Sequence, residues 1–168
     1  MTPDDLVRQH ADLAYRVCLR VTGNRDDAAD ATQRVLVKLW QHAPDIEPDK
    51  RRAWTARVAR NASLDLLRRR AVRPTPAHEA LPERIALEPT PDADAEASDL
   101  RRHLDAAVAR LDEPYRSIVV LREVEGLPYA EIADALDLPL NTLKVYLHRA
   151  RKRLRSSLRA SAPDLVPS

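Results

Sequence analysis

The sequence predicts an all-α protein, with two small helical domains joined by an acidic, Pro-rich flexible linker. The 168 residues include only 2 glycines, so the positive-φ turns of a multistranded sheet would be difficult to supply. Apolar residues recur at helical spacing in both halves of the chain. Prolines and acidic residues gather between these halves, and such a segment favours an extended tether over regular structure.

The first predicted domain covers residues 1–73 and holds three helices. Apolar residues repeat at helical spacing over residues 4–22, and Gly23-Asn24 breaks the repeat. Asp26-Asp27 opens the second helix, where carboxylates suit the positive end of the helix dipole. A loop over residues 44–48 leads to the third helix, from Arg51 to about Arg73, which carries many arginines.

Charge divides the chain into three blocks. Residues 1–73 carry 15 Lys and Arg against 10 Asp and Glu, residues 74–98 carry 1 against 6, and residues 99–168 carry 12 against 10. Two basic blocks around an acidic one favour two anion-binding modules joined by a tether. The alternative is a set of ordinary solvated helix faces.

The second predicted domain covers residues 99–160, followed by a tail over residues 161–168. Helices are expected from about Leu100 to Leu111 and from Pro114 until Gly126 ends the helix. Two further helices, 129–136 and about 141–158, are separated by a short turn, as in a helix-turn-helix.

The last predicted helix combines an apolar stripe with a basic outer face. The stripe, expected to be continuously buried, consists of Leu143, Leu147, Ala150, Leu154 and Leu158. The residues left outside are Asn141, Lys144, Val145, His148, Arg149 and Lys152. From residue 144 to 159 there are 7 basic residues and no acidic one, which suits phosphate and major-groove contacts. The spacing of the apolar and basic residues favours a DNA-binding helix-turn-helix over an αα-hairpin with a solvated basic face.

Other functional classes find little support. The single cysteine, Cys18, lies in an apolar repeat typical of a buried thiol, and the histidines are scattered, so we expect no metal site and no cofactor. We see no glycine-rich phosphate loop or nucleophile elbow, which argues against an enzyme. Asp65 is better explained by pairing with Arg68 or Arg69 than by acid–base chemistry.

The sequence also bears on location and oligomeric state. Without a membrane-spanning apolar run or a signal-peptide pattern, the expected location is cytoplasmic with no membrane insertion. A monomer is expected because the sequence shows no heptad seam and no spare apolar face.

Four segments, in order, resemble the extracytoplasmic-function (ECF) sigma factors of bacterial RNA polymerase. Residues 26–40 (DDAADATQRVLVKLW) resemble the region 2 helix that docks on polymerase. Residues 53–70 (AWTARVARNASLDLLRRR) are similar to the promoter-melting helix that follows it. Residues 109–133 (ARLDEPYRSIVVLREVEGLPYAEIA) resemble region 4, and residues 142–151 (TLKVYLHRAR) resemble its recognition helix. The resemblance therefore covers the chain except for the linker and the tail.

The resemblance implies a sigma factor that directs core polymerase to promoters and starts transcription. The implied minus-35 contacts are the six outer residues of the last helix, with Lys144, Val145 and Arg149 foremost. The resemblance implies that the loop over residues 44–52 contacts the minus-10 element. The further implied minus-10 and melting contacts are Trp54, Arg57, Arg60, Asn61, Arg68, Arg69 and Arg70. For Trp54 a core role is at least as well supported as base stacking. The implied polymerase contacts are Asp30, Gln33, Arg34, Leu36, Val37 and Trp40.

The implied partners are the β′ clamp helices and β flap of core polymerase, promoter DNA, and an anti-sigma factor. The acidic residues 79–96 could imitate nucleic acid in a polymerase channel, although a plain soluble spacer explains them almost as well.

Some positions depart from the pattern of the family. The recognition helix commonly opens with GTVKSR, whereas this chain has NTLKVY, so Asn141 is expected to cap the helix and Val145 and Tyr146 replace polar contacts. Arg34 occupies a position where the polymerase-facing helix of the family often has Glu. Pro128 occupies a position where a Ser or Thr helix cap is usual.

Two other readings remain open from the sequence. One is a helix-turn-helix regulator that acts without polymerase, against which the region 2-like half argues. The other is a sigma mimic that only sequesters an anti-sigma factor, because the altered recognition helix could have lost its DNA contacts.

Overall fold

The computed structural model describes residues 2–72 and 95–165. Within these ranges the chain is helical and contains no strand, as the sequence predicts. The expectations for the acidic linker fall largely on residues 73–94, outside the described residues. No helix in the described ranges is long and apolar enough to cross a membrane.

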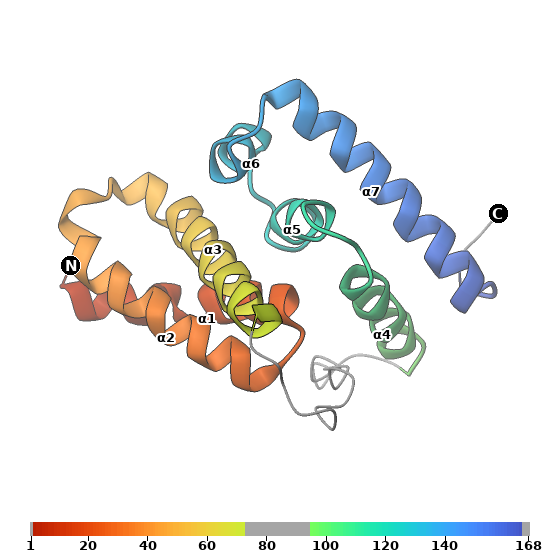
Figure 1. Cartoon of the computed structure of the whole chain (residues 1–168), viewed down its shortest axis with the longest axis horizontal. Helices are drawn as coiled ribbons and strands as arrows, with labels where there is room; N and C mark the ends of the chain where they lie inside the picture. The colour runs from red at the N-terminus through yellow and green to blue at the C-terminus, as the bar shows by residue number, and fades with distance from the viewer. Residues whose placement is uncertain (1, 73–94, 166–168) are drawn as a thin grey trace.

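The N-terminal domain consists of α1 (Pro3–Thr22), α2 (Arg25–His42) and α3 (Arg51–Val72), which pack against one another (Figure 1). Thr2 and Asp5 form a capping box at the start of α1. Gly23 ends α1 with φ 69°, a left-handed conformation that favours glycine. The Asn24 side chain then accepts a hydrogen bond from the Asp27 N–H at 3.0 Å and begins α2. These caps explain why the predicted helix ends are close to the observed ones.

The C-terminal domain consists of α4 (Ala95–Ala109), α5 (Tyr115–Val119), a π-helical turn η3 (Val120–Val124), α6 (Tyr129–Leu136) and α7 (Leu140–Ser161). In Figure 1, α5 is seen end-on between α3 and α7. Helix α4 begins before the predicted helix start at about Leu100 and before the predicted domain start at residue 99, because Ala95, Glu96 and Ala97 are good helix formers.

The sequence predicts one helix from Pro114 to Gly126, but the structure divides it into α5 and the π-helical turn. Ile118, Val119, Val120 and Leu121 are consecutive and are all almost fully buried. An α-helix that buries one face cannot bury four consecutive side chains on it. This segment is instead enclosed on several sides, since it packs against α7 and also contacts α1.

Buried side chains of the two domains form one continuous core. The same apolar cluster contains Val17 and Ala59 from the N-terminal domain and Leu121, Leu127 and Ile132 from the C-terminal domain. Two short 3-10 turns, Ala43–Asp45 and Pro48–Lys50, connect α2 to α3 on the side where α6 approaches.

Candidate nucleic-acid and protein interfaces

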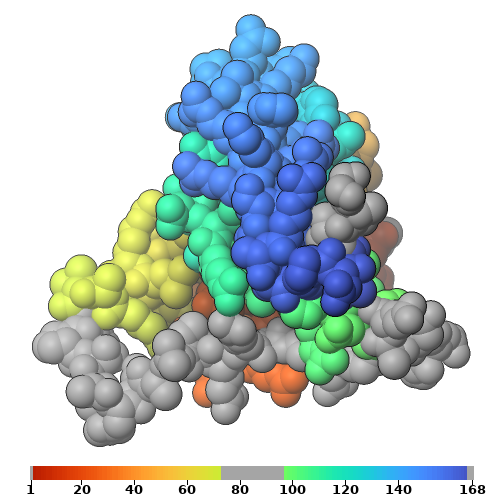
Figure 2. All heavy atoms as spheres, turned by 90° about the vertical axis from the view of Figure 1, so that its right-hand side faces the viewer, coloured from red at the N-terminus to blue at the C-terminus, as the bar shows by residue number. Residues whose placement is uncertain are grey.

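The outer face of α7 presents the six residues that the sequence assigned to DNA. Asn141, Lys144, Val145, His148, Arg149 and Lys152 are all exposed. Seen from the side in Figure 2, α7 forms a broad outer surface of the molecule. The pattern of apolar residues facing in and polar ones facing out thus leaves a polar, basic helix face of the kind that suits a DNA groove.

The start of α7 differs from the expected capping. Pro139 occupies the N-cap position, and its carbonyl accepts a hydrogen bond from the Leu143 N–H at 3.0 Å. Asn141 therefore lies inside the first turn and does not cap the helix, contrary to the expectation. The extended conformation of Pro139 places the helix start one residue earlier than predicted.

Tyr146 turns away from the outer face of α7. Its ring meets the Tyr115 ring of α5 edge-on, with centroids 5.5 Å apart, an arrangement that stabilises aromatic pairs. The Arg149 guanidinium lies 5.9 Å from the Tyr146 ring centroid, within reach of a cation–π contact. Of the two unusual residues in the recognition helix, only Val145, with 48% of its surface exposed, points outward.

The apolar stripe of α7 is fully buried only in its first half. Leu143, Leu147 and Ala150 are buried, but Leu154 and Leu158 are partly exposed and line a groove of about 740 Å³ between α4 and α7. The prediction of a continuous buried stripe is therefore wrong, because α4 does not cover the end of α7 fully. The groove is mainly apolar, and arginines from α1, α4 and α7 stand at its edges. Sequence periodicity missed it, because periodicity does not distinguish a covered stripe from an open one.

A cleft of about 920 Å³ lies between α3, the 3-10 turns and α6. Trp54, Arg57 and Asn61 line it from α3, and Asp134 and Asp137 line it from the side of α6. Trp54 is half-buried: it packs against the core and also lies 6.1 Å from the His42 ring. Trp54 therefore packs against the core and still presents part of its ring to the cleft, so a core role and base stacking are compatible.

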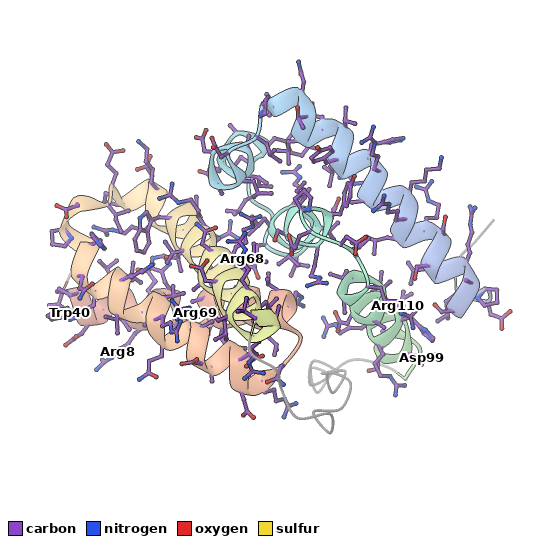
Figure 3. The ribbon with its side chains drawn as sticks, viewed as in Figure 1. Arg8, Trp40, Arg68, Arg69, Asp99 and Arg110 are labelled. Atoms are coloured by element: carbon purple, nitrogen blue, oxygen red, sulfur yellow. The ribbon has the colours of Figure 1, made fainter. Side chains whose placement is uncertain are left out.

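The predicted phosphate-binding arginines of α3 occupy different environments. Arg57, Arg68, Arg69 and Arg70 are exposed, and Figure 3 shows Arg68 and Arg69 on the part of α3 that follows the cleft (Figure 3). Arg68 pairs with Asp65 at 3.5 Å, which confirms the predicted local pairing, and Arg70 pairs with the buried Asp27 of α2.

Arg60 differs from these arginines because the C-terminal domain covers it. Its Nε donates a hydrogen bond to the Ser117 hydroxyl at 3.2 Å. Burial lowers the pKa of Arg60, and the nearby Glu113 partly opposes this. The structure therefore places Arg60 in the contact between the two domains.

One face of α2 is exposed and partly apolar. Asp30, Gln33, Val37 and Trp40 follow each other at helical spacing and are all exposed, with 51% of Val37 and 53% of Trp40 accessible. The Trp40 indole N–H donates to Asp4 at 3.3 Å, and Trp40 lies far from α4–α7 in Figure 3. Arg34 pairs with Asp30 at 3.6 Å, whereas Leu36 turns partly into the core. Large apolar side chains exposed in one row are typical of a docking surface.

No group of three His, Cys, Asp or Glu side chains in the described residues is arranged to hold a metal ion. Cys18 is buried, and its Sγ lies 3.7 Å from the Ala59 carbonyl. Burial raises the pKa of this thiol. Both observations agree with a structural role for Cys18.

Two family models match the two domains in chain order. Sigma-70 region 2 matches residues 6–73, and Sigma-70, region 4 matches residues 101–154. Curated relatives of the chain are also named as sigma factors. The ECF RNA polymerase sigma factor SigE of Mycolicibacterium smegmatis is 37% identical over 98% of this chain and 65% of its own length. SigL of Mycobacterium tuberculosis, also an ECF RNA polymerase sigma factor, is 34% identical over 91% of this chain and 86% of its own length.

Two solved structures resemble the whole described arrangement. The sigma factor RpoE in complex with the anti-sigma factor NepR, from Bartonella quintana, has a TM-score of 0.77 at 21% identity and covers 93% of this chain and 96% of that one. CnrH in complex with the cytosolic domain of CnrY has a TM-score of 0.66 at 25% identity and covers 95% and 89%. The arrangement of helices is therefore one that these two solved structures also contain.

Proposed function

Because this chain belongs to the ECF sigma factors of RNA polymerase, we propose that it binds core polymerase and directs it to promoters that carry a minus-35 and a minus-10 element. The observation that carries the proposal is that two surfaces of different chemistry lie on the two domains matched to regions 2 and 4. One is the basic outer face of α7 and the other is the partly apolar face of α2.

The outer face of α7 is proposed to read the minus-35 element in the major groove. Lys144 and Arg149 can donate to guanine edges or phosphates, and the exposed Val145 can meet a thymine methyl group. His148 and Lys152 extend the same face and add phosphate contacts, while Asn141 stands at its beginning. Base specificity is expected to come from Lys144, Val145 and Arg149.

The cleft beside α3 is proposed to bind the minus-10 strand after it separates. An unstacked base needs a flat partner and hydrogen-bond donors, which Trp54, Arg57 and Asn61 supply along one edge of the cleft. Arg68, Arg69 and Arg70 continue along the same helix and would hold phosphates. Arg60 would join them once the contact with Ser117 opens.

Two surfaces are proposed for the polymerase. The exposed row on α2, with Val37 and Trp40 at its centre and Asp30, Gln33 and Arg34 beside them, fits the β′ clamp helices. The groove between α4 and α7 fits an apolar helix such as that of the β flap, because Leu104, Leu154 and Leu158 line it.

An anti-sigma factor is also proposed as a partner. The first solved structure described above is a sigma factor in complex with an anti-sigma factor, and the second, CnrH, was determined in complex with the cytosolic domain of CnrY. The exposed row on α2 and the apolar groove of the C-terminal domain are surfaces that an anti-sigma factor could cover in competition with polymerase.

Run-off transcription with purified core polymerase tests the proposal. On a library of promoter fragments, we expect specific transcripts only when this protein is added, and we expect Arg149→Ala to remove them. Arg159→Ala is the matched control, since Arg159 lies on the same helix beyond the region 4 match. If the protein neither binds core polymerase nor supports transcription, the proposal is wrong, and the sigma mimic or the free-standing regulator takes its place.

A further inference from the structure

Two tyrosines pack against each other where α5 meets α7, which lie side by side in Figure 1. Tyr146 belongs to the first half of α7, and Tyr115 is the first residue of α5. Their rings meet edge-on at an interplanar angle of 61°. Tyr115 also packs against the buried cluster of Leu111, Val119 and Ala150. The Tyr146 ring therefore rests on a partner that is fixed to the core of the C-terminal domain.

Each of these rings also lies beside an arginine of α7. The Arg149 guanidinium lies 5.9 Å from the centroid of the Tyr146 ring, and the Arg153 guanidinium lies 4.4 Å from that of the Tyr115 ring. A guanidinium is attracted to an aromatic face up to a distance of about 6 Å. The Arg149 contact is close to this limit, so the ring orients Arg149 without holding it as firmly as an ion pair would.

The Arg149 side chain combines this orientation with a free charge. Residues three positions apart are neighbours on a helix surface, so Tyr146 lies directly beside Arg149. Arg149 and Arg153 are both exposed, and within the described residues neither forms a salt bridge. The ring contact therefore limits the directions that Arg149 can take, while its charge stays available for DNA.

Orientation matters for the contact that Arg149 is proposed to make. A two-pronged contact with guanine requires the guanidinium to point at the base edge with its plane close to that of the base pair. A freely rotating arginine loses side-chain freedom when it adopts this geometry, and an arginine that is already restricted loses less. A ring that restricts Arg149 in advance can therefore favour the correct base pair over the others.

We propose that Tyr146, held in place by Tyr115, is a positioning residue that sets how selectively Arg149 reads its base pair in the minus-35 element. The proposal rests on the proposed function, which assigns Arg149 to that element. Neither tyrosine needs to touch DNA for this role. Tyr115 thereby becomes a determinant of base selectivity that lies outside the helix-turn-helix itself.

The first test measures the orientation of Arg149 in the full chain without DNA. An aromatic ring shifts the magnetic resonances of protons near its face, so the Arg149 Hδ resonances report the contact. We expect Tyr146→Leu to move these resonances toward ordinary arginine values and Tyr115→Leu to move them part of the way. Tyr115→Phe keeps the ring and is expected to leave them in place. Resonances that Tyr146→Leu does not move would contradict the contact.

The second test measures base selectivity with the full chain in polymerase holoenzyme. The probes are a promoter fragment that supports run-off transcription and its single base-pair substitutions through the upstream element. Loss of selectivity in Arg149→Ala identifies the base pair that Arg149 reads. At this base pair, Tyr146→Leu is expected to reduce selectivity about three- to fivefold, the effect of one exposed cation–π contact. Selectivity at the other base pairs is expected to persist.

A double-mutant cycle separates positioning from a general effect on α7. Tyr146→Leu alone is expected to weaken binding to the original fragment about three- to fivefold. If Tyr146 acts through Arg149, it has no further effect on this affinity once Arg149→Ala is present. Additive losses would show that Tyr146 contacts DNA or supports the helix independently, and would overturn the proposal.

The matched control is Tyr129→Leu. Tyr129 of α6 also lies beneath an arginine, with the Arg122 guanidinium 4.3 Å from its ring centroid. The substitution removes the same kind of contact from the same domain without touching Arg149, so selectivity at the Arg149 base pair is expected to persist. If Tyr115→Leu loses its helical circular dichroism, Tyr146→Leu decides the question, because Tyr146 is only partly buried.

The outcomes distinguish this proposal from the proposed function. If the holoenzyme neither binds nor transcribes any fragment, both are wrong. If fragments are bound and transcribed, but Tyr146→Leu leaves selectivity at the Arg149 base pair unchanged, only the positioning role is wrong. The same holds if Arg149→Ala changes no base preference at all.

Discussion

At the scale of single residues, the division of α7 into inward and outward side chains carries most of the DNA-binding argument. Leu143 and Leu147 fix the rotation of the helix by burial, and Tyr146 is held against Tyr115. Arg149 is left on the exposed face, with its guanidinium near the Tyr146 ring. This contact limits the positions that the Arg149 side chain can take before DNA binds, and so reduces the entropy lost on binding.

Arg149→Ala is therefore expected to weaken minus-35 binding by about tenfold or more, the effect of losing one good base contact. Polymerase holoenzyme binding to promoter fragments with an intact or a scrambled minus-35 element measures it. The loss should appear on the intact element and largely vanish on the scrambled one. An equal loss on both would mean that Arg149 contacts only phosphate.

His10 gives the N-terminal domain a predicted sensitivity to acid. It is buried in α1, and its pKa is lowered by this burial and by the positive charge of Arg51. The unfolded chain, with an ordinary histidine pKa of about 6.5, takes up a proton before the folded chain does. Stability is therefore expected to fall as the pH drops through this value.

Thermal unfolding between about pH 7.5 and about pH 5.5 measures this dependence. We expect His10→Gln to reduce the loss of Tm in acid, while the exposed His148→Gln leaves it unchanged. If His10→Gln unfolds with the same pH dependence as the unaltered chain, the assignment of the acid response to His10 is wrong.

At the scale of elements, the two faces of α2 differ in role. The buried face stabilises the fold, and the exposed face is the one proposed to dock on polymerase. Leu39 is fully buried, whereas the adjacent Trp40 is more than half exposed. Leu39→Ala is expected to lower the free energy of unfolding by about 2–5 kcal/mol and to leave the polymerase affinity of the folded fraction unchanged. Trp40→Ala is expected to do the reverse, with little loss of stability and about tenfold weaker binding to core polymerase.

Denaturant unfolding and core-polymerase binding of both variants measure this separation. Equal stability losses in the two variants would show that Trp40 belongs to the core. Unchanged polymerase binding in Trp40→Ala would remove the exposed row of α2 from the docking surface.

The elements themselves could be predicted well from the sequence, because local signals determine them. Gly23-Asn24 marks the boundary between α1 and α2, and the apolar repeat of α7 determines its outer face. The π-helical turn could not be predicted, since it depends on burial from several sides at once. The pairing of Glu125 with Arg16 joins residues far apart in the chain, and neither residue stands out in a local pattern.

At the scale of the whole molecule, the two domains combine a shared apolar core with a polar, incompletely satisfied boundary. The shared apolar side chains hold the domains together, and the unpaired buried polar atoms offset part of that stabilisation. The proposed function assigns α7 and the cleft of α3 to two DNA elements that are read at the same time.

The most direct test of this account is to sequence the genomic fragments that the reconstituted holoenzyme retains. The fragments are expected to share an upstream and a downstream element at constant spacing. Arg149→Ala should lose the preference for the upstream element alone, and Asn61→Ala the preference for the downstream element alone. Fragments without two shared elements, or the loss of both preferences in either variant, would contradict the assignment of one promoter element to each domain.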